Sequence, residues 1–272
     1  MNIQEQMKLF YENPVIAWHE HYSSLDSKEA MDPAYVDRCV KMMDDYGIDK
    51  VVTSVPIADE RQCPPEHFTH VNDITYETIK RHPDRFYGQA FVNPGYYRET
   101  VKELERCADM GFVGVKLYHQ YFMDDPAMYP MIEKCIELDF PILMHSAKGT
   151  DWETNFMQPR CTNGVHMANV ARRYPEATFI MGHIGGGGDW QWSIKAIQDT
   201  PNVFADMGGS VHDCPLLEES VALLGADRIL FATDGSFACG VGKILGADIS
   251  EEDKKTILNG TKFRRFLERG KK

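Results

Sequence analysis

The chain has 272 residues, of which 43% are hydrophobic and 26% are charged. This length and balance fit one large α/β barrel or two ordinary domains, and they exclude disorder for most of the chain. The formal net charge is -12. Because an acidic surface repels phosphate groups, we expect neither nucleic acid nor a membrane surface as a partner.

Cysteine usage and the first residues indicate the compartment. The chain has seven cysteines, an odd number; they are widely spaced and form no CxxC pair. This pattern predicts reduced thiols rather than disulfides or a thiolate zinc site. The first ten residues have no apolar core of a signal peptide. No apolar run approaches the ~20 residues of a membrane helix. We therefore expect a cytoplasmic protein.

Short apolar runs recur along the whole chain at intervals of about 25–35 residues, the size of a βα unit. Their length and their content of Val, Ile, Leu, Phe and Met predict buried parallel strands. There are eight such runs, namely Val15–Trp18, Lys50–Val55, Phe86–Val92, Phe112–Leu117, Pro141–Met144, Thr178–Met181, Val203–Met207 and Arg228–Thr233.

The segments between these runs carry helix signals. Pro33–Tyr46 precedes Gly47, and Tyr97–Met110 precedes Gly111, so a glycine follows each predicted helix. Asp125 followed by Pro126 is typical of a helix start. Near the C-terminus, Ser250 is predicted to cap one helix. That helix would carry Ile257, Leu258, Phe266 and Leu267.

Strand and helix alternate eight times, which predicts a parallel sheet covered by helices. Even spacing favours closure into a (β/α)8 barrel of the TIM type over an open doubly wound sheet. No linker rich in Pro, Gly or Ser divides the chain. We therefore predict a single α/β domain over residues 1–272, with residues 1–13 as an N-terminal extension.

Polar residues with useful chemistry follow several of the predicted strands. His19 and His21 follow the first, His145 the fifth, His183 the sixth and Asp234 the eighth. In a parallel barrel the active site lies at the carboxyl ends of the strands. We therefore expect these five side chains to converge.

The convergence predicts a metal site. Strand alternation places His19 and His21 on one face and turns Trp18 and Glu20 away, so Glu20 is not expected to be a ligand. Two imidazoles on one face can bind one ion at ~2.0–2.1 Å. His145 and Asp234 complete a set of three nitrogens and one oxygen. This set favours Zn²⁺ and also accommodates Mn²⁺, Fe²⁺ or Co²⁺.

The order of these motifs resembles a known family. His19-x-His21, His145, His183-x-Gly185-Gly186 and Asp234 resemble the amidohydrolase superfamily, and the closing segment Ile257–Phe266 resembles the final helix of one branch. That amidohydrolase-related branch includes aminocarboxymuconate-semialdehyde decarboxylase and resorcylate decarboxylases. The resemblance runs from about Ile16 to Phe266.

One residue has two interpretations in the light of this resemblance. Lys116 is the next-to-last residue of the predicted fourth strand. Some superfamily members carry a carboxylated lysine there that bridges two metals. We favour a charged group that lines the site or pairs with a carboxylate.

The chemistry that follows most directly is hydrolysis of an ester, lactone or amide of a small molecule by metal-activated water. Asp234 would bind the metal and accept the water's proton, and His183 would stabilise an oxyanion or act as a second acid or base. The alternatives are a decarboxylase or hydratase acting on a small carboxylate, with Lys116 and Arg160 as anchors, and a barrel that binds metal without catalysis. Assembly as a homo-oligomer is left open.

Overall fold

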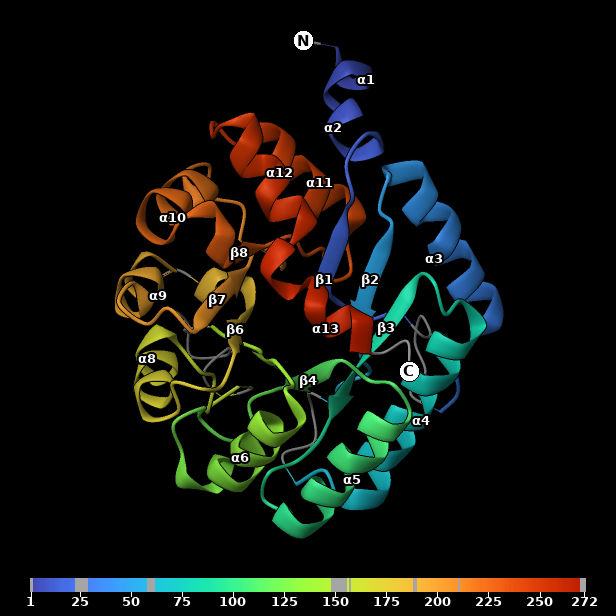
Figure 1. Cartoon of the computed structure of the whole chain (residues 1–272), viewed down its shortest axis with the longest axis vertical. Coiled ribbons are helices and arrows are strands. Elements are labelled where there is room, and N and C mark those ends of the chain that lie inside the picture. The colour runs from blue at the N-terminus through green and yellow to red at the C-terminus, as the bar shows by residue number, and fades with distance from the viewer. Residues whose placement is uncertain are drawn as a thin grey trace.

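The computed structural model describes residues 2–22, 29–57, 62–147, 156, 158–187, 190–209 and 211–269. Eight parallel strands pair in chain order into one sheet that curves into a barrel, with helices on its outside (Figure 1). The strands are β1 Ile16–Glu20, β2 Lys50–Thr53, β3 Phe86–Phe91, β4 Gly114–Leu117, β5 Ile142–Met144, β6 Phe179–Met181, β7 Val203–Asp206 and β8 Ile229–Leu230.

Helices follow the strands around the barrel. In the first half they are α1 Ile3–Gln6, α2 Lys8–Tyr11, α3 Pro33–Tyr46, α4 Pro65–Arg81, α5 Tyr97–Asp109 and α6 Tyr129–Leu138. In the second half they are α8 Gly164–Arg173, α9 Trp190–Ile197, α10 Leu216–Leu224, α11 Phe237–Gly246, α12 Glu251–Asn259 and α13 Arg264–Arg269. The predicted (β/α)8 barrel is therefore confirmed, and each predicted strand overlaps an observed one.

Two backbone hydrogen bonds join the last strand region to the first. Trp18 N–H donates to Phe231 O at 2.9 Å, and Asp234 N–H donates to His19 O at 3.0 Å. The second of these bonds ties the chain at Asp234 directly to His19. Closure of the barrel thus sets two predicted site residues side by side.

Apolar side chains fill two separate spaces. The larger cluster lies between the sheet and the helices, and includes Phe10 of α2, whose ring centroid is 5.8 Å from that of Phe231. The smaller cluster fills the barrel interior with residues from the strands or their edges and from the last helical turns. Its members are Ile16, Trp18, Val52, Tyr87, Val113, Leu143, Ile180, Phe204, Leu230, Phe263, Phe266 and Leu267.

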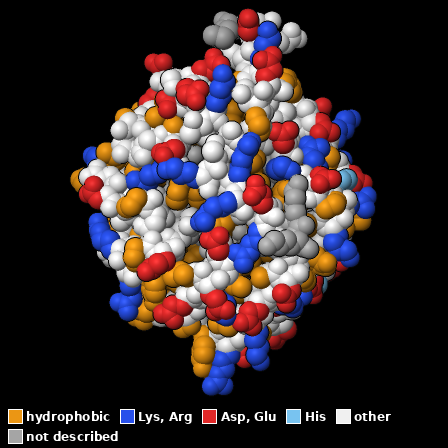
Figure 2. Space-filling model, in the orientation of Figure 1, with side chains coloured by type: hydrophobic (Ala, Val, Ile, Leu, Met, Phe, Trp, Pro, Cys, Tyr) orange, Lys and Arg blue, Asp and Glu red, His pale blue; other side chains and the backbone are white. Residues whose placement is uncertain are grey.

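Helix α13 closes the amino-terminal end of the barrel. Arg265 pairs with Asp139 at 3.3 Å, and Arg269 lies over the ring of Phe140 at 5.4 Å; both partners precede β5. On the face seen in Figure 2, acidic and basic side chains are interspersed. The opposite, carboxyl end of the barrel is left for the site.

The prediction of one continuous C-terminal helix from Ser250 through Leu267 is wrong. Ser250 does cap α12, but Gly260 ends that helix with a left-handed φ of 54°. A short 3-10 turn, Thr261–Phe263, then leads into α13. A side chain at position 260 would overlap the Trp18 ring, so the bend brings the backbone against the barrel interior.

Among the described residues, no helix combines the length and the apolar character needed to cross a membrane.

Candidate metal centre

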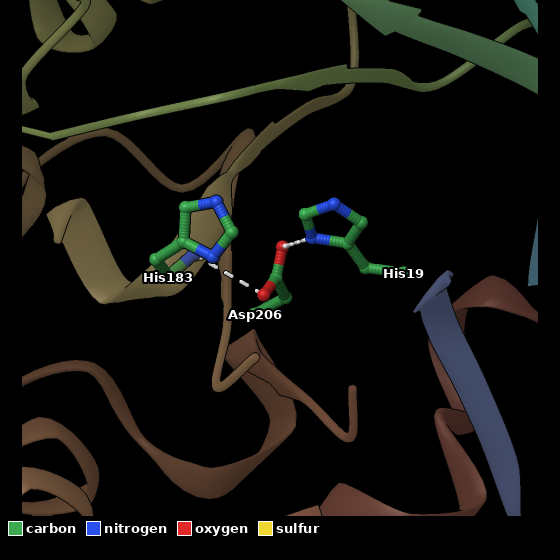
Figure 3. A group of neighbouring side chains, drawn as sticks. All are labelled: His19, His183 and Asp206. Carbon is green, nitrogen blue, oxygen red and sulfur yellow. Dashed lines mark hydrogen bonds and ion pairs between the residues drawn. The ribbon is translucent and has the colours of Figure 1, made fainter. Parts of the chain in front are cut away.

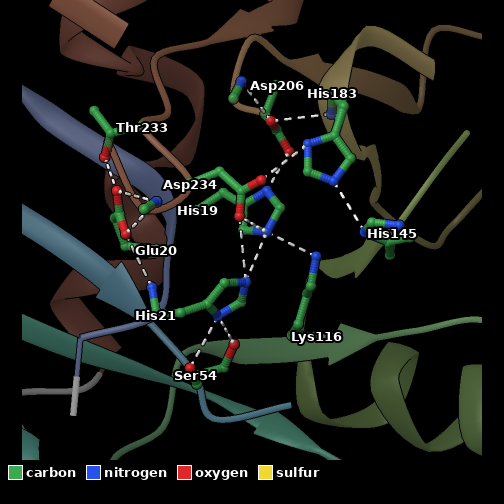
Figure 4. A network of polar contacts seen from close by, with 12 residues as sticks. His19, Glu20, His21, Ser54, Lys116, His145, His183, Asp206, Thr233 and Asp234 are labelled. Atoms are coloured by element: carbon green, nitrogen blue, oxygen red, sulfur yellow. Dashed lines mark hydrogen bonds and ion pairs between the residues drawn. The ribbon is translucent and has the colours of Figure 1, made fainter. Parts of the chain in front are cut away.

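The predicted site residues other than Arg160 gather at the carboxyl ends of the strands (Figure 4). His19 lies in β1 and His21 directly after it. His145 follows β5, His183 follows β6, and Asp234 follows β8. Lys116 enters from β4 and Asp206 ends β7. The site thus draws side chains from around the barrel, and different subsets of them lie close enough together to share an ion.

Strand β1 does not follow regular alternation. Its register against β2 shifts between Ala17 and Glu20. Trp18 packs in the barrel interior, 5.0 Å from Phe263 between ring centroids, although alternation predicted it on the face opposite His19. His19 and His21 nevertheless converge, with 3.3 Å between their Nε2 atoms. The irregular strand therefore still delivers both imidazoles to one place.

Hydrogen bonds on the far side of each ring fix which nitrogen faces the cluster. His19 Nδ1 lies 3.1 Å from Asp206 Oδ2, and His21 Nδ1 lies 3.0 Å from the backbone oxygen of Ser54. Both partners are acceptors, so each Nδ1 carries the proton and each Nε2 offers a lone pair. Asp234 Oδ1 lies 3.4 Å from both Nε2 atoms.

Two groups of potential ligands share His19. The first comprises His19, His21 and Asp234, and the second comprises His19, His183 and Asp206 (Figure 3). In each group the ligand atoms lie within 4.8 Å of one another. The first group matches three of the four predicted ligands. Asp206, a member of the second, was not among the predicted ligands.

His145 is held beside this cluster rather than within it. Its Nδ1 lies 3.0 Å from His183 Nε2, and its Nε2 lies 3.2 Å from Gln158 Oε1. Tyr118 stacks on its ring at 4.0 Å between centroids and 11° between planes. His145 thus contacts the predicted catalytic histidine, and it belongs to neither ligand group among the described residues.

A strained backbone presents His183. Its φ is 60° and that of Ile184 is 51°, both in the left-handed region that L-residues seldom occupy. Asp206 Oδ1 accepts the backbone N–H of His183 at 3.2 Å and that of Gly208 at 2.9 Å. The ring then points Nδ1 toward Asp234 Oδ2 at 3.4 Å. Such strain, held by surrounding contacts, is typical of functional sites.

Burial and charge set the ionisation of the cluster. Burial lowers the pKa of His19, lowers that of His183 to about 4, and lowers that of His145 well below its usual value. For Asp206, burial acts to raise the pKa, but His19, His183 and Lys116 together outweigh it and the pKa falls to about 2. The three imidazoles are therefore neutral and Asp206 ionised at neutral pH. These are the forms that bind cations.

Asp234 and Lys116 carry opposite charges in this space. Burial alone would raise the pKa of Asp234, yet His19, His21 and His183 hold it well below its usual range. Burial lowers the pKa of Lys116 to about 8, against the opposing effect of Asp234 and Asp206. Lys116 Nζ lies 2.7 Å from His19 Nε2. A buried cation thus sits against a predicted ligand atom.

Arg160, the other predicted anchor, lies outside the cluster. It is exposed, donates a hydrogen bond to Gln120 O at 2.8 Å, and covers the Tyr121 ring at 5.5 Å. Gln158, two residues earlier, is the one that reaches His145.

Glu20 supports the site from outside it. Its carboxylate accepts hydrogen bonds from the backbone N–H groups of His21 and Gly235 and from the hydroxyls of Tyr22 and Thr233. Burial raises its pKa to about 7. Glu20 thereby ties the His21 backbone to the loop that carries Asp234. It belongs to neither of the two ligand groups.

Sequence reasoning missed several contacts of this site. Asp206 lies near the end of a predicted strand, and His19 and Asp234 directly follow predicted strands, so the position of Asp206 was an available signal. Ser54 contributes a backbone oxygen, which any residue would offer, and Gln158 lies in a long connection. Neither had a sequence signal.

Comparisons with known proteins agree with the geometry. A family model described as amidohydrolase matches residues 16–261. Gamma-resorcylate decarboxylase from Polaromonas sp. (strain JS666) is 28% identical over 276 residues, covering 81% of this chain and 84% of the relative. The 2-amino-3-carboxymuconate-6-semialdehyde decarboxylase of Dictyostelium discoideum is 23% identical, covering 80% and 72%.

A solved structure supports the same fold. Dihydroxybenzoic acid decarboxylase from Polaromonas sp. JS666, crystallised with manganese and the inhibitor 2-nitroresorcinol, superimposes with a TM-score of 0.71 at 22% identity. The match covers 93% of this chain and 97% of that one.

These relatives correct the main functional prediction. Hydrolysis of an ester, lactone or amide followed from a generic metal-bound water, whereas the relatives named above are decarboxylases. The prediction of a hydrolase is therefore wrong, and the decarboxylase alternative fits better. A ligand set alone does not distinguish the two, since both reactions use a Lewis acid beside a proton donor. The chain belongs to the amidohydrolase family, in the amidohydrolase-related branch that contains these decarboxylases.

Proposed function

We propose that this chain is a divalent-metal-dependent decarboxylase that acts on a small carboxylate. The observation that carries the proposal is the convergence of His19 Nε2, His21 Nε2 and Asp234 Oδ1 beside the buried ammonium of Lys116. Two imidazole nitrogens and a carboxylate form a ligand set for Zn²⁺ or Mn²⁺. A cation next to that set suits a substrate that carries a carboxylate.

The donor chemistry of the residues fits a metal ion. Both Nδ1 atoms are committed to acceptors, so each ring directs its Nε2 lone pair into the cluster, where a cation could bind it. His19, His21 and Asp234 would hold the ion, and His145 is proposed as the fourth ligand, which requires its ring to leave its contact with His183 or with Gln158. When bound, the metal would act as a Lewis acid that polarises an oxygen of the substrate. A relative carries manganese, and we propose either manganese or zinc here.

Decarboxylation replaces a carbon–carboxylate bond with a carbon–hydrogen bond. The electron pair of the broken bond stays on the carbon and takes up a proton, so one carboxylate and one proton yield one product and one carbon dioxide. The chain must therefore bind the carboxylate and deliver a proton to the adjacent carbon. Lys116 is proposed for the first task.

Asp234 is proposed to relay the proton: because its carboxyl group is ionised in the free protein, it would first take up a proton from solvent and then pass it to the carbon. Its Oδ1 faces the two ligand histidines, while its Oδ2 faces His183 Nδ1 at 3.4 Å. One oxygen can thus serve the metal while the other exchanges a proton with His183. His183 contacts His145 through its other nitrogen, so its ring is held in one orientation. General acid catalysis of this kind contributes about 10²–10⁴-fold in rate.

Arg160 is proposed as an outer anchor for a second anionic group of the substrate. Its position at the surface beside Gln120 and Tyr121 suits a role at the entrance rather than at the reacting carbon.

The proposal is tested by loading the purified protein with Mn²⁺ or Zn²⁺ and measuring carbon dioxide release from a panel of hydroxybenzoates and conjugated dicarboxylates. We expect release from at least one substrate, and loss of it after chelation and in the double variant His19→Ala, His21→Ala. If the panel gives no carbon dioxide while metal-dependent hydrolysis of esters is found, the proposal is wrong.

A further inference from the structure

Lys116 occupies an unusual place for a cation beside a metal site. Its side chain is fully buried, and its Nζ lies 2.7 Å from His19 Nε2 (Figure 4). That same Nε2 atom faces His21 Nε2 at 3.3 Å and Asp234 Oδ1 at 3.4 Å. Lys116 therefore contacts the atom around which the first ligand group is arranged.

His19 has only one lone pair to offer at this atom. Because Nδ1 carries the proton that Asp206 accepts, Nε2 holds a single in-plane lone pair. An ammonium whose Nζ lies 2.7 Å away and a metal ion at the usual ~2.0–2.1 Å cannot both use it. In addition, the ammonium repels a divalent ion at this range. Metal binding to His19 therefore requires Lys116 to leave.

A displaced Lys116 then needs a new acceptor. His19 Nε2 is its hydrogen-bond partner among the described residues; the Tyr118 ring lies 5.5 Å from Nζ, and Asp234 and Asp206 attract the ammonium electrostatically. A buried ammonium without an acceptor is costly. A carboxylate that enters beside the metal would accept from Lys116 and remove that cost.

We propose that Lys116 and the metal ion compete for the lone pair of His19 Nε2, so that the metal is held tightly only when a carboxylate ligand takes over the Lys116 ammonium. Metal and carboxylate then bind cooperatively, and by linkage each raises the affinity for the other by the same factor. The identification of that carboxylate with the substrate rests on the proposed function.

The test compares metal affinities, measured by competition with a chromophoric chelator. Lys116→Met removes the competing ammonium, and Lys50→Met removes a lysine at the opposite end of the barrel, where it bonds Asp84 O. We expect Lys116→Met to bind Mn²⁺ or Zn²⁺ about tenfold more tightly or better than the unaltered protein. Lys50→Met should bind it with unchanged affinity.

A second arm uses two ligands that differ only in the carboxylate. We expect 2,6-dihydroxybenzoate to raise the metal affinity of the unaltered protein, and resorcinol to leave it unchanged. In Lys116→Met the increase should be about tenfold smaller or absent, since no ammonium remains to be relieved. Lys116→Gln, of similar length, is measured alongside, and circular dichroism confirms that each variant is folded.

Several outcomes would overturn the proposal. Weaker metal binding in Lys116→Met and Lys116→Gln would make Lys116 a ligand, as a carboxylated lysine would be. Unchanged metal affinity in both folded variants would show that Lys116 does not compete with the metal. Equal effects of 2,6-dihydroxybenzoate and resorcinol on the metal affinity would show that the carboxylate plays no part. If instead the coupling is found but no carbon dioxide is released, the proposed function fails and the competition stands.

Discussion

Asp206 Oδ2 lies 3.1 Å from His19 Nδ1, and this pair decides which nitrogen of His19 faces the metal group. The other oxygen of Asp206 accepts the backbone N–H groups of His183 and Gly208. One buried carboxylate therefore orients a proposed metal ligand and holds the backbone of the proposed catalytic histidine.

Asp206→Asn tests this arrangement. The amide would keep one oxygen for the backbone N–H groups and turn its NH₂ toward His19 Nδ1, which favours the tautomer with the proton on Nε2. We expect metal affinity to fall by about 10–100-fold, as for other partners that orient metal ligands. Elemental analysis after dialysis against a weak chelator measures the loss. Full metal retention would show that Asp206 does not control the tautomer.

Glu20 is predicted to support the loop of Asp234 without binding the metal. Glu20→Gln places one oxygen toward the N–H groups and an NH₂ toward the two hydroxyls, which can accept. We expect it to keep nearly all of its metal. Glu20→Ala leaves several buried donors unsatisfied and should lower the free energy of unfolding by about 2–4 kcal/mol, measured by chemical denaturation. Metal loss in a folded Glu20→Gln protein would make Glu20 a ligand.

Gly209 leaves room for His183. It has a φ of +75°, and a Cβ there would overlap His183 Nδ1. Gly209→Ala should displace the imidazole and reduce decarboxylation by about 10²-fold or more, because small misplacements of a catalytic group are costly. Gly242→Ala is the matched control, because Gly242 lies in α11 and a Cβ added there would point into open space. That variant should keep full activity and gain up to about 1 kcal/mol in stability.

Substitutions of Asp234 and His183, the two residues proposed to carry the proton, should differ in their effects on metal content. Asp234→Asn retains one oxygen for the metal but has almost no basicity, so we expect partial metal content with turnover reduced about 10²-fold or more. His183→Asn should lose turnover to a similar extent and keep its metal. Inductively coupled plasma analysis and a carbon dioxide assay provide the two readouts. If His183→Asn removes the metal, the group of His19, His183 and Asp206 is the one that binds it.

Much of the fold followed from local pattern. Buried parallel strands such as Ile142–Met144 are nearly continuous apolar runs, and Gly47 ends α3 in the left-handed conformation that its position predicted. Gly260 interrupts the last helix because the backbone there must pass close to Trp18. Only tertiary packing reveals that constraint.

The site residues that directly follow a predicted strand could be predicted from the sequence, and the other contacts of the site could not. His19, His21 and Asp234 converge as expected, because the carboxyl ends of parallel strands share one edge. The contact of Lys116 with His19 depends on the reach of a long side chain across the barrel, which spacing does not encode. Likewise, His145 meets His183 rather than His19 because Gln158 and Tyr118 hold its ring.

The central claim is that a metal centre at His19, His21 and Asp234 drives exchange of a carboxylate for a proton. It is tested most directly by running the metal-loaded reaction in D₂O and analysing the product by mass spectrometry and NMR. The account predicts one carbon dioxide per product and one deuterium on the carbon that carried the carboxylate, with both lost in the double variant His19→Ala, His21→Ala. A product without deuterium at that carbon, or equal turnover in the double variant, would contradict it.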